Sequence, residues 1–325
     1  MRIDKKKLVD LCVKALVKRR LSTNQAKLVV DEFLDAELRG QAEHGFFTFP
    51  QFVSKLTVPQ TKPKILKETN NLLYIDGQGN FGQVVCNQYV PKLISKARRH
   101  NIAIMGIVNM RSYQMPGTYA RLAAQNNLVA FVFNYGGGSR VAPFGSIDPI
   151  LGANPIAIGL PSKNFPVVLD MSTSKVAAMN IRLATLFGRR IPLGIAMDKS
   201  GKPTRDPRQA LAGAILPFGE YKGSGLALIL ELLTRAMFGL NLSNKTKTKR
   251  GYVFILFNPI VFGSIEKFKK ANDLLIKQIK NSRRAKGIKE IFVPGERGER
   301  LKKLNSKKDF IVLDRKIVED IKALL

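Results

Sequence analysis

Short apolar runs that alternate with helical segments constrain the fold of this chain more than any other feature. Ile102–Val108 and Leu128–Phe133 are runs suited to buried strands, and residues 117–126 between them have a helical pattern. Similar runs occur at 72–75, 156–160, 167–170 and 253–257. Strands that alternate with helices are typical of mixed α/β layers, so the sequence predicts an α/β fold.

Amphipathic helices are predicted at the N-terminus. Residues 4–20 and 24–39 carry apolar side chains at helical spacing. Ser22 and its neighbours supply N-cap chemistry for the second helix, and Gly40 fits its C-terminal end. Further helices are expected at 50–56, 84–100, 175–187, 223–240, 264–280 and 315–324.

The bulk properties are those of a globular protein. With 325 residues the chain has room for about two domains. It contains no apolar run of the ~18 residues that a membrane span needs, and Met1–Lys7 does not resemble a signal peptide. Cys12 and Cys86 are interpreted as buried thiols, so neither a disulfide framework nor a metal site is expected, and the expected location is a reducing cytoplasm.

The net charge of +30 has two explanations. Clustered Lys and Arg can bind a polyanion such as nucleic acid. Here the basic groups are spread along the whole chain, and no aromatic-interleaved RNA-binding motif accompanies them. Lysine enrichment on solvated faces is therefore favoured, and a nucleic-acid partner is not.

His44 is the strongest candidate for proton chemistry. The chain has only two histidines, and the other, His100, follows two arginines. Neutral imidazole is the side chain best suited to exchange a proton near pH 7. His44 also sits where a helix gives way to a loop marked by Gly45 and Pro50. The fingerprints of nucleotide-binding Rossmann domains, P-loops, zinc proteases and serine hydrolases are missing from the sequence.

Six separated segments together resemble the malate/L-lactate/ureidoglycolate dehydrogenase family, the sulfolactate dehydrogenase-like NAD(P)-dependent oxidoreductases. They occur in the family's order along almost the whole chain. The segments are Leu38–Pro50, Leu151–Ile158 (similar to L-G-T-N-P-I-A-I), Val168–Ser174 (similar to V-L-D-M-A-T-S), Pro203–Pro207, Leu216–Gly223 and Pro294–Glu296.

The resemblance implies a non-Rossmann fold and an enzyme. A helical part would comprise residues 1–72, 172–245 and 310–325, and a mixed-sheet, cofactor-facing part residues 73–171 and 246–309. Strands of the sheet would recur near 253–293. The implied protein is a homodimer with active sites near the subunit interface. It would transfer a hydride between NAD or NADP and a small 2-hydroxy or 2-oxo acid, or a related ketone, with His44 as proton donor and acceptor.

The resemblance also implies where the cofactor binds. Hydroxyls and backbone N–H groups at a helix start can hold a pyrophosphate, and a lysine can add a point charge. Each segment also has a structural alternative. Ser172–Ser174 could be only an N-cap, Lys222-Gly223 a solvated turn, and Pro294-Gly295 a common turn pair. The implied residues are Val168, Leu169, Asp170, Met171, Ser172, Thr173 and Ser174, then Lys222 and Gly223, then Pro294, Gly295 and Glu296.

The sequence departs from the family mainly on the substrate side. Where the family has S-H-G-x-x-R-x-P-x-Y, this chain keeps His44 but has Glu43, Thr48 and Phe52 in place of the serine, arginine and tyrosine. Thr48 cannot clamp a carboxylate as the arginine can. Gln114 replaces a second histidine and can hydrogen-bond a substrate oxygen, but it cannot exchange a proton.

Ala178-Met179-Asn180 likewise replaces a small-Gly-Lys run of the family. Arg111 or Arg140 could replace the lost cation, but a role as surface arginines is favoured for both, because arginine is mostly exposed. These departures leave three hypotheses open. They are an active 2-hydroxyacid dehydrogenase, a family member with lost or altered chemistry, and a polyanion-binding protein.

Overall fold

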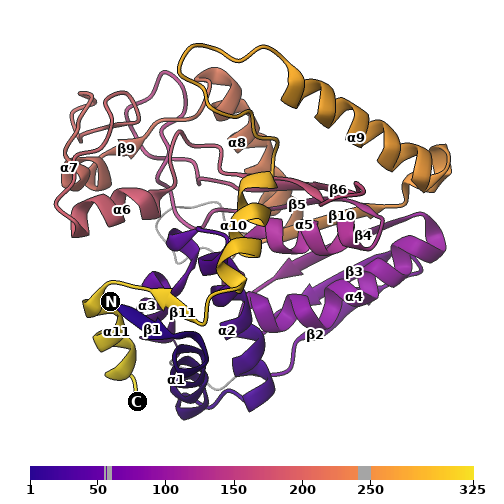
Figure 1. Cartoon of the computed structure of the whole chain (residues 1–325), viewed down its shortest axis with the longest axis horizontal. Coiled ribbons are helices and arrows are strands. Elements are labelled where there is room, and N and C mark those ends of the chain that lie inside the picture. The colour runs from indigo at the N-terminus through magenta and orange to yellow at the C-terminus, as the bar shows by residue number, and fades with distance from the viewer. Residues whose placement is uncertain (55, 57–60, 241–249) are drawn as a thin grey trace.

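A mixed sheet organises the molecule. The computed structural model describes residues 1–54, 56, 61–240 and 250–325. Its main sheet has the strand order β2-β3-β4-β10-β5-β6-β7 (Figure 1). β3 and β4 pair parallel and all other neighbours antiparallel, which confirms the predicted α/β fold. The strands are β2 (Lys64–Glu68), β3 (Leu72–Asp76), β4 (Ile102–Val108), β5 (Val129–Asn134), β6 (Ile156–Leu160), β7 (Val167–Met171) and β10 (Tyr252–Phe257).

The pairing gathers the ends of several strands at one edge. β3, β4, β5 and β7 all run in the same direction, because two antiparallel steps separate β4 from β5 and β5 from β7. The loops after these strands therefore leave from one side of the sheet, which we call the carboxyl edge. Such an edge is where α/β sheets present ligand sites.

Both faces of the sheet are covered. In β10, Phe254 and Leu256 pack with helices α4 (Gly82–His100) and α5 (Pro116–Gln125) in one core. Val253 and Ile255 pack on the other side with Leu230 of α8 (Tyr221–Thr234). The side chains alternate between two apolar layers because successive residues of a strand point to opposite faces.

A second core lies among the N-terminal and C-terminal elements. Helices α1 (Lys5–Lys18), α2 (Thr23–Leu38) and α3 (Phe49–Ser54) pack there with α11 (Arg315–Lys322). Strand β1 (Arg2–Asp4) pairs with β11 (Phe310–Val312), so the two chain ends lie together in Figure 1. Ser22 caps α2 in a capping box with Gln25, and Gly40 has φ +73°, as the sequence predicted.

Several expectations were wrong, and others differ from the structure only in the bounds of a helix. No sheet strand follows β10 up to residue 293 within the described ranges. The helix expected at 175–187 is α6 (Ala178–Leu186), and the one expected at 223–240 ends at Thr234 before a short turn η3 (Ala236–Phe238). The sequence analysis also missed helix α10 (Glu296–Ser306).

The remaining elements are small or peripheral. They are α7 (Pro207–Ala212), the hairpin of β8 (Ala196–Met197) and β9 (Ala214–Ile215), the turn η4 (Pro259–Phe262) and helix α9 (Ile265–Asn281). Among the described residues, no helix is both long and apolar enough to cross a membrane. The division of the chain into a helical and a sheet part stays a prediction.

Candidate active site

His44 lies in a tight turn that is held against the end of α2. It closes the 3-10 turn η1 (Ala42–His44), and a second such turn, η2 (Phe46–Thr48), follows. Glu37 of α2 accepts the backbone N–H of Phe46 at 3.1 Å. A Cβ on Gly45 would lie 2.2 Å from the Glu37 Oε2 atom, so the residue after His44 has room only for glycine. The half-buried imidazole is thereby presented on a fixed turn.

Asp170 is a buried carboxyl group whose charge interacts with that of His44. It lies near the end of β7, and its Oδ2 atom accepts the backbone N–H of Gly117 at 2.9 Å. Burial raises the pKa of Asp170, while the Gly117 hydrogen bond and the charges of His44 and Arg121 oppose this rise. A carboxylate in this relation to an imidazole can orient the ring and stabilise its protonated form.

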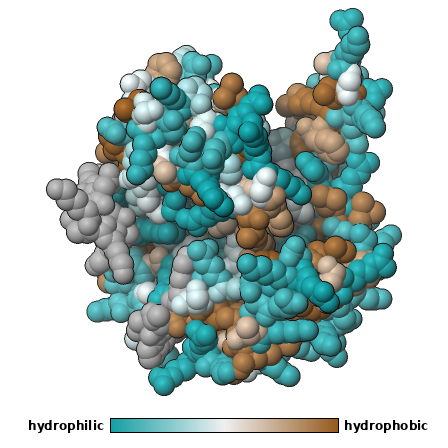
Figure 2. Space-filling view, turned by 90° about the vertical axis from the view of Figure 1, so that its left-hand side faces the viewer, coloured by the Kyte–Doolittle hydropathy of each residue, from teal (hydrophilic) through white to brown (hydrophobic). Residues whose placement is uncertain are grey.

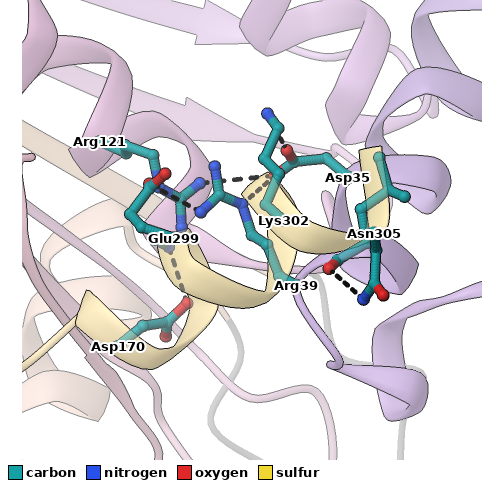
Figure 3. Close-up of polar contacts among 9 residues, drawn as sticks. Asp35, Arg39, Arg121, Asp170, Glu299, Lys302 and Asn305 are labelled. Carbon is teal, nitrogen blue, oxygen red and sulfur yellow. Dashed lines mark hydrogen bonds and ion pairs between the residues drawn. The ribbon is translucent and has the colours of Figure 1, made fainter. Parts of the chain in front are cut away.

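Arg121 belongs to an ion-pair network that docks α10 onto α2 and α5 (Figure 3). Arg39, whose side chain is only 3% exposed, contacts Asp35 at 2.6 Å and Glu299 at 2.7 Å. Arg121 reaches Glu299 at 3.2 Å, and Lys302 reaches Asp35 at 2.6 Å. These five residues form what we call the α2–α10 network, and they keep the start of α10 close to Asp170.

The first predicted cofactor segment lies beside the third. The backbone N–H of Val168 donates to the carbonyl of Pro294 at 3.2 Å. Gly295 has φ +87°, and a Cβ there would come within 3.0 Å of the Val168 nitrogen. Glu296 pairs with Lys280 and accepts the Val293 N–H at 3.2 Å. The structure thus brings Pro294–Glu296 alongside the start of β7.

The second predicted segment meets the other end of β7. Phe218 donates its N–H to the Thr173 carbonyl at 3.0 Å, and Gly223 donates to the Phe218 carbonyl at 2.9 Å. A Cβ on Gly223 would lie 2.2 Å from the Phe218 oxygen and 2.9 Å from the Thr173 oxygen. Lys222 is exposed in the first turn of α8. The second and third segments therefore lie at opposite ends of the first, which contains most of the edge strand β7.

The hydroxyl residues after β7 do not cap the following helix, so the N-cap alternative is wrong. The cap residue of α6 is Ala177, which makes no side-chain hydrogen bond. The Ser172 and Ser174 Oγ atoms are instead 2.9 Å apart, and Thr173 Oγ1 donates to the Ala153 carbonyl at 3.0 Å. Leu169 and Met171 continue β7 on either side of Asp170.

The predicted substrate-side residues lie on three different loops. Thr48 is buried, and its hydroxyl donates to the Gly45 carbonyl at 3.1 Å. Gln114 has φ +67° and is partly exposed in the loop after β4. Arg140 follows the glycine loop after β5, and burial together with the charges of Arg182 and Arg250 lowers its pKa.

Sequence reasoning missed several residues around this site. Asp170 was assigned to the cofactor, and its relation to His44 was not expected because the two are far apart in the chain. Arg121, Arg182 and Arg250 were missed as well, since isolated arginines give no spacing signal. Among the described residues, no group of three or more His, Cys, Asp or Glu side chains is arranged to hold a metal ion.

Comparison with known proteins identifies the family. The profile of malate/L-lactate dehydrogenase matches residues 3–322. Malate/(S)-sulfolactate dehydrogenase from Methanothermus fervidus is 35% identical over 97% of this chain and 94% of its own length. L-sulfolactate dehydrogenase from Methanocaldococcus jannaschii is 36% identical over 99% of this chain and 94% of its own length.

Solved structures agree with the sequence comparisons. Sulfolactate dehydrogenase from Methanocaldococcus jannaschii superimposes with a TM-score of 0.89 at 35% identity, covering 100% of this chain and 96% of that one. Malate dehydrogenase from Entamoeba histolytica gives a TM-score of 0.93 at 25% identity, covering 100% and 97%. The protein therefore belongs to the malate/L-lactate dehydrogenase family of oxidoreductases.

Proposed function

We propose that this protein is an NAD(P)-dependent 2-hydroxyacid dehydrogenase in which His44 exchanges the proton with the substrate oxygen. The observation that supports this role is the placement of a half-buried His44 opposite Asp170 at the carboxyl edge of the sheet. Family membership supports the oxidoreductase class. The substrate would be a small 2-hydroxy or 2-oxo acid, or a related ketone.

The residues along β7 fit an extended dinucleotide. Two glycines, Gly223 and Gly295, let neighbouring backbone segments pack closely at the two ends of this strand. Ser172 offers a partly exposed hydroxyl, and the exposed Lys222 offers a charge for a phosphate. NAD or NADP bound there would donate or accept the hydride.

The chain's own residues then handle the proton. In the reduction direction His44 gives a proton to the carbonyl oxygen, and in the oxidation direction it removes the hydroxyl proton. Asp170 would help to orient the ring, because its charge interacts with that of His44. Gln114 can hydrogen-bond the same oxygen but cannot replace His44, since an amide does not titrate near pH 7.

Turnover with NADH and NADPH tests this assignment. A panel of 2-oxo acids is screened by loss of NADH or NADPH absorbance, with wild type, His44→Ala and His100→Ala. His100 is exposed at the end of α4 and serves as the matched control. We expect His44→Ala to lower kcat/KM by roughly 100-fold or more and His100→Ala to leave it unchanged. Absence of turnover on every acid, or full activity of His44→Ala, would contradict the assignment.

We also propose a homodimer that uses the exposed side of α8. Hydrophilic residues cover most of the face shown in Figure 2, between smaller hydrophobic areas. α8, in contrast, carries a row of exposed apolar side chains, which is typical of an interface. They are Leu228, Ile229, Leu232 and Leu233. Light scattering should give twice the 36.1 kDa chain mass for wild type and a smaller mass for Ile229→Glu.

A further inference from the structure

Two arginines, Arg140 and Arg250, lie beside the glycine loop at the carboxyl edge, and the charge of a third, Arg182, acts on Arg140. Gly137 has φ +72°, and a Cβ there would lie 2.2 Å from the guanidinium carbon of Arg250. The next glycine, Gly138, would place its Cβ 3.8 Å from the Arg140 Nε atom. The loop therefore lacks side chains where the two guanidinium groups lie, and it lets both approach the backbone.

The third arginine, Arg182, comes from α6, the helix that packs against the His44 turn η1. Its charge reaches Arg140, because burial and then the charges of Arg182 and Arg250 lower the pKa of that guanidinium. The main chain of Arg140 is fixed on both sides. Its N–H donates to the Leu151 carbonyl and its carbonyl accepts the Ile215 N–H, each at 2.9 Å.

This trio is not neutralised by carboxylates. In the part of the chain that the structure describes, none of the three arginines takes part in an ion pair. Residues 55, 57–60 and 241–249, which lie outside it, include no Asp or Glu. Two tyrosines also interact with the trio: Tyr135 acts on the charge of Arg140, and Tyr252 hydrogen-bonds with Arg250.

The buried arginines elsewhere in the molecule, in contrast, pair with carboxylates. Arg39 contacts two carboxylates, and Arg235, which is 1% exposed, pairs with Glu231 in the next turn of the same helix. Among the described residues, the two arginines that are buried, Arg39 and Arg235, therefore each have an acidic partner. Three like charges held together without one are costly, and an anion that binds among them removes that cost.

The glycine loop beside these arginines is one segment away from the predicted cofactor turn. Gly136 donates its N–H to the Asn154 side chain at 3.0 Å, and the neighbouring Ala153 carbonyl accepts the N–H of Thr173 at 2.9 Å. The cofactor phosphates have Lys222 as a cation under the proposed function. The substrate side has no cation at position 48, where the side chain is a threonine. The Thr48 hydroxyl is buried and already donates to the Gly45 carbonyl.

We propose that Arg140, Arg182 and Arg250 form an oxyanion pocket that binds the second acidic group of the substrate, a carboxylate or a sulfonate. The enzyme then selects diacids over monoacids, because planar guanidinium groups bind such oxyanions through paired hydrogen bonds. This inference rests on the proposed function, since it concerns the substrate of the same site.

The test compares two substrates that differ by one carboxylate, L-malate and L-lactate. Wild type, Arg140→Gln, Arg182→Gln and Arg250→Gln are assayed with NAD and NADP. We expect each substitution to lower the malate-to-lactate ratio of kcat/KM by roughly 10–100-fold. Arg140→Lys should recover part of the ratio because it keeps a charge but not the paired geometry. Arg190→Gln, on the exposed turn after α6, should leave the ratio as in wild type.

Two results would overturn the inference. One is an unchanged ratio in all three glutamine variants. The other is a rise in the KM of the dinucleotide with an unchanged ratio, which would assign the pocket to a cofactor phosphate. Calorimetric titration of L-malate in the presence of NADH separates the two proposals. Malate binding that depends on Arg140 supports the pocket even if no turnover is found, and binding that is unaffected by Arg140→Gln refutes it.

Discussion

Glu32 provides a direct test of how burial controls charge in this fold. The residue lies on α2 and is 9% exposed. Its Oε1 atom accepts the Tyr119 hydroxyl at 2.6 Å and the Asn87 amide at 3.1 Å. Burial raises the pKa of the carboxyl from 4.5 to about 8, although both hydrogen bonds act to lower it. Glu32 is therefore protonated at neutral pH in the folded protein.

The raised pKa makes stability depend on pH with a defined sign. Between pH 4.5 and about pH 8 the folded state binds a proton that the unfolded state has released. The contribution of Glu32 is thus complete below pH 4.5 and is lost as the pH rises toward 8, by about 1.4 kcal/mol per pH unit. At pH 7 the loss amounts to about 3 kcal/mol.

Glu32→Gln removes this dependence. The glutamine carbonyl can accept both existing hydrogen bonds and carries no titrating proton. Chemical unfolding of wild type, Glu32→Gln and the exposed control Glu319→Gln is measured at pH 5, 6, 7 and 8. We expect the advantage of Glu32→Gln over wild type to grow steadily with pH, while Glu319→Gln runs parallel to wild type. Parallel curves for wild type and Glu32→Gln would refute the reasoning.

Two further substitutions test the packing and the charges around the candidate site. Gly223→Ala places a Cβ 2.2 Å from the Phe218 oxygen, so we expect a lower melting temperature and weaker binding of NADH, measured by fluorescence. Gly225→Ala is the control, because its Cβ meets open space and NADH binding should be retained. Burial raises the pKa of Asp35, but hydrogen bonds and charges from Arg39, Lys302 and Arg121 outweigh this and hold it below 3.8. Asp35→Asn should therefore cost about 1–3 kcal/mol at pH 7, and urea unfolding should show that cost disappearing as wild type is acidified below pH 3.8.

Elements with a strong apolar period could be predicted from the sequence, and elements held by charge could not. β4 and α2 appear where periodicity placed them, because each buries a regular set of apolar side chains. Helix α10 has no buried residue and a highly polar sequence. It depends on tertiary contacts such as the Glu299 pair with Arg39 and the Asn305 hydrogen bond to Leu38. A pattern of apolar spacing cannot reveal such a helix.

The site was predictable to the extent that short motifs carry it. Gly295 permits a close backbone approach to Val168 of β7, and Gly223 permits one to Phe218 and Thr173. The role of both glycines in binding a cofactor stays a prediction. The partners of His44 and Arg140 come from remote parts of the chain. Their proximity follows from strand order, since the carboxyl edge collects loops from β5 and β7 as well as the start of β10. The order of the strands in the sheet could not be predicted from the residue types along the chain.

Arg121 links the docking of α10 to the proposed proton chemistry. Glu299 lies one turn beyond the predicted cofactor residue Glu296, and it contacts both Arg39 and Arg121. The charge of Arg121 also acts on Asp170 and opposes the rise in its pKa that burial causes. The ion pair that holds α10 against α5 therefore also bears on the charge of Asp170, which interacts with the proposed proton carrier, His44.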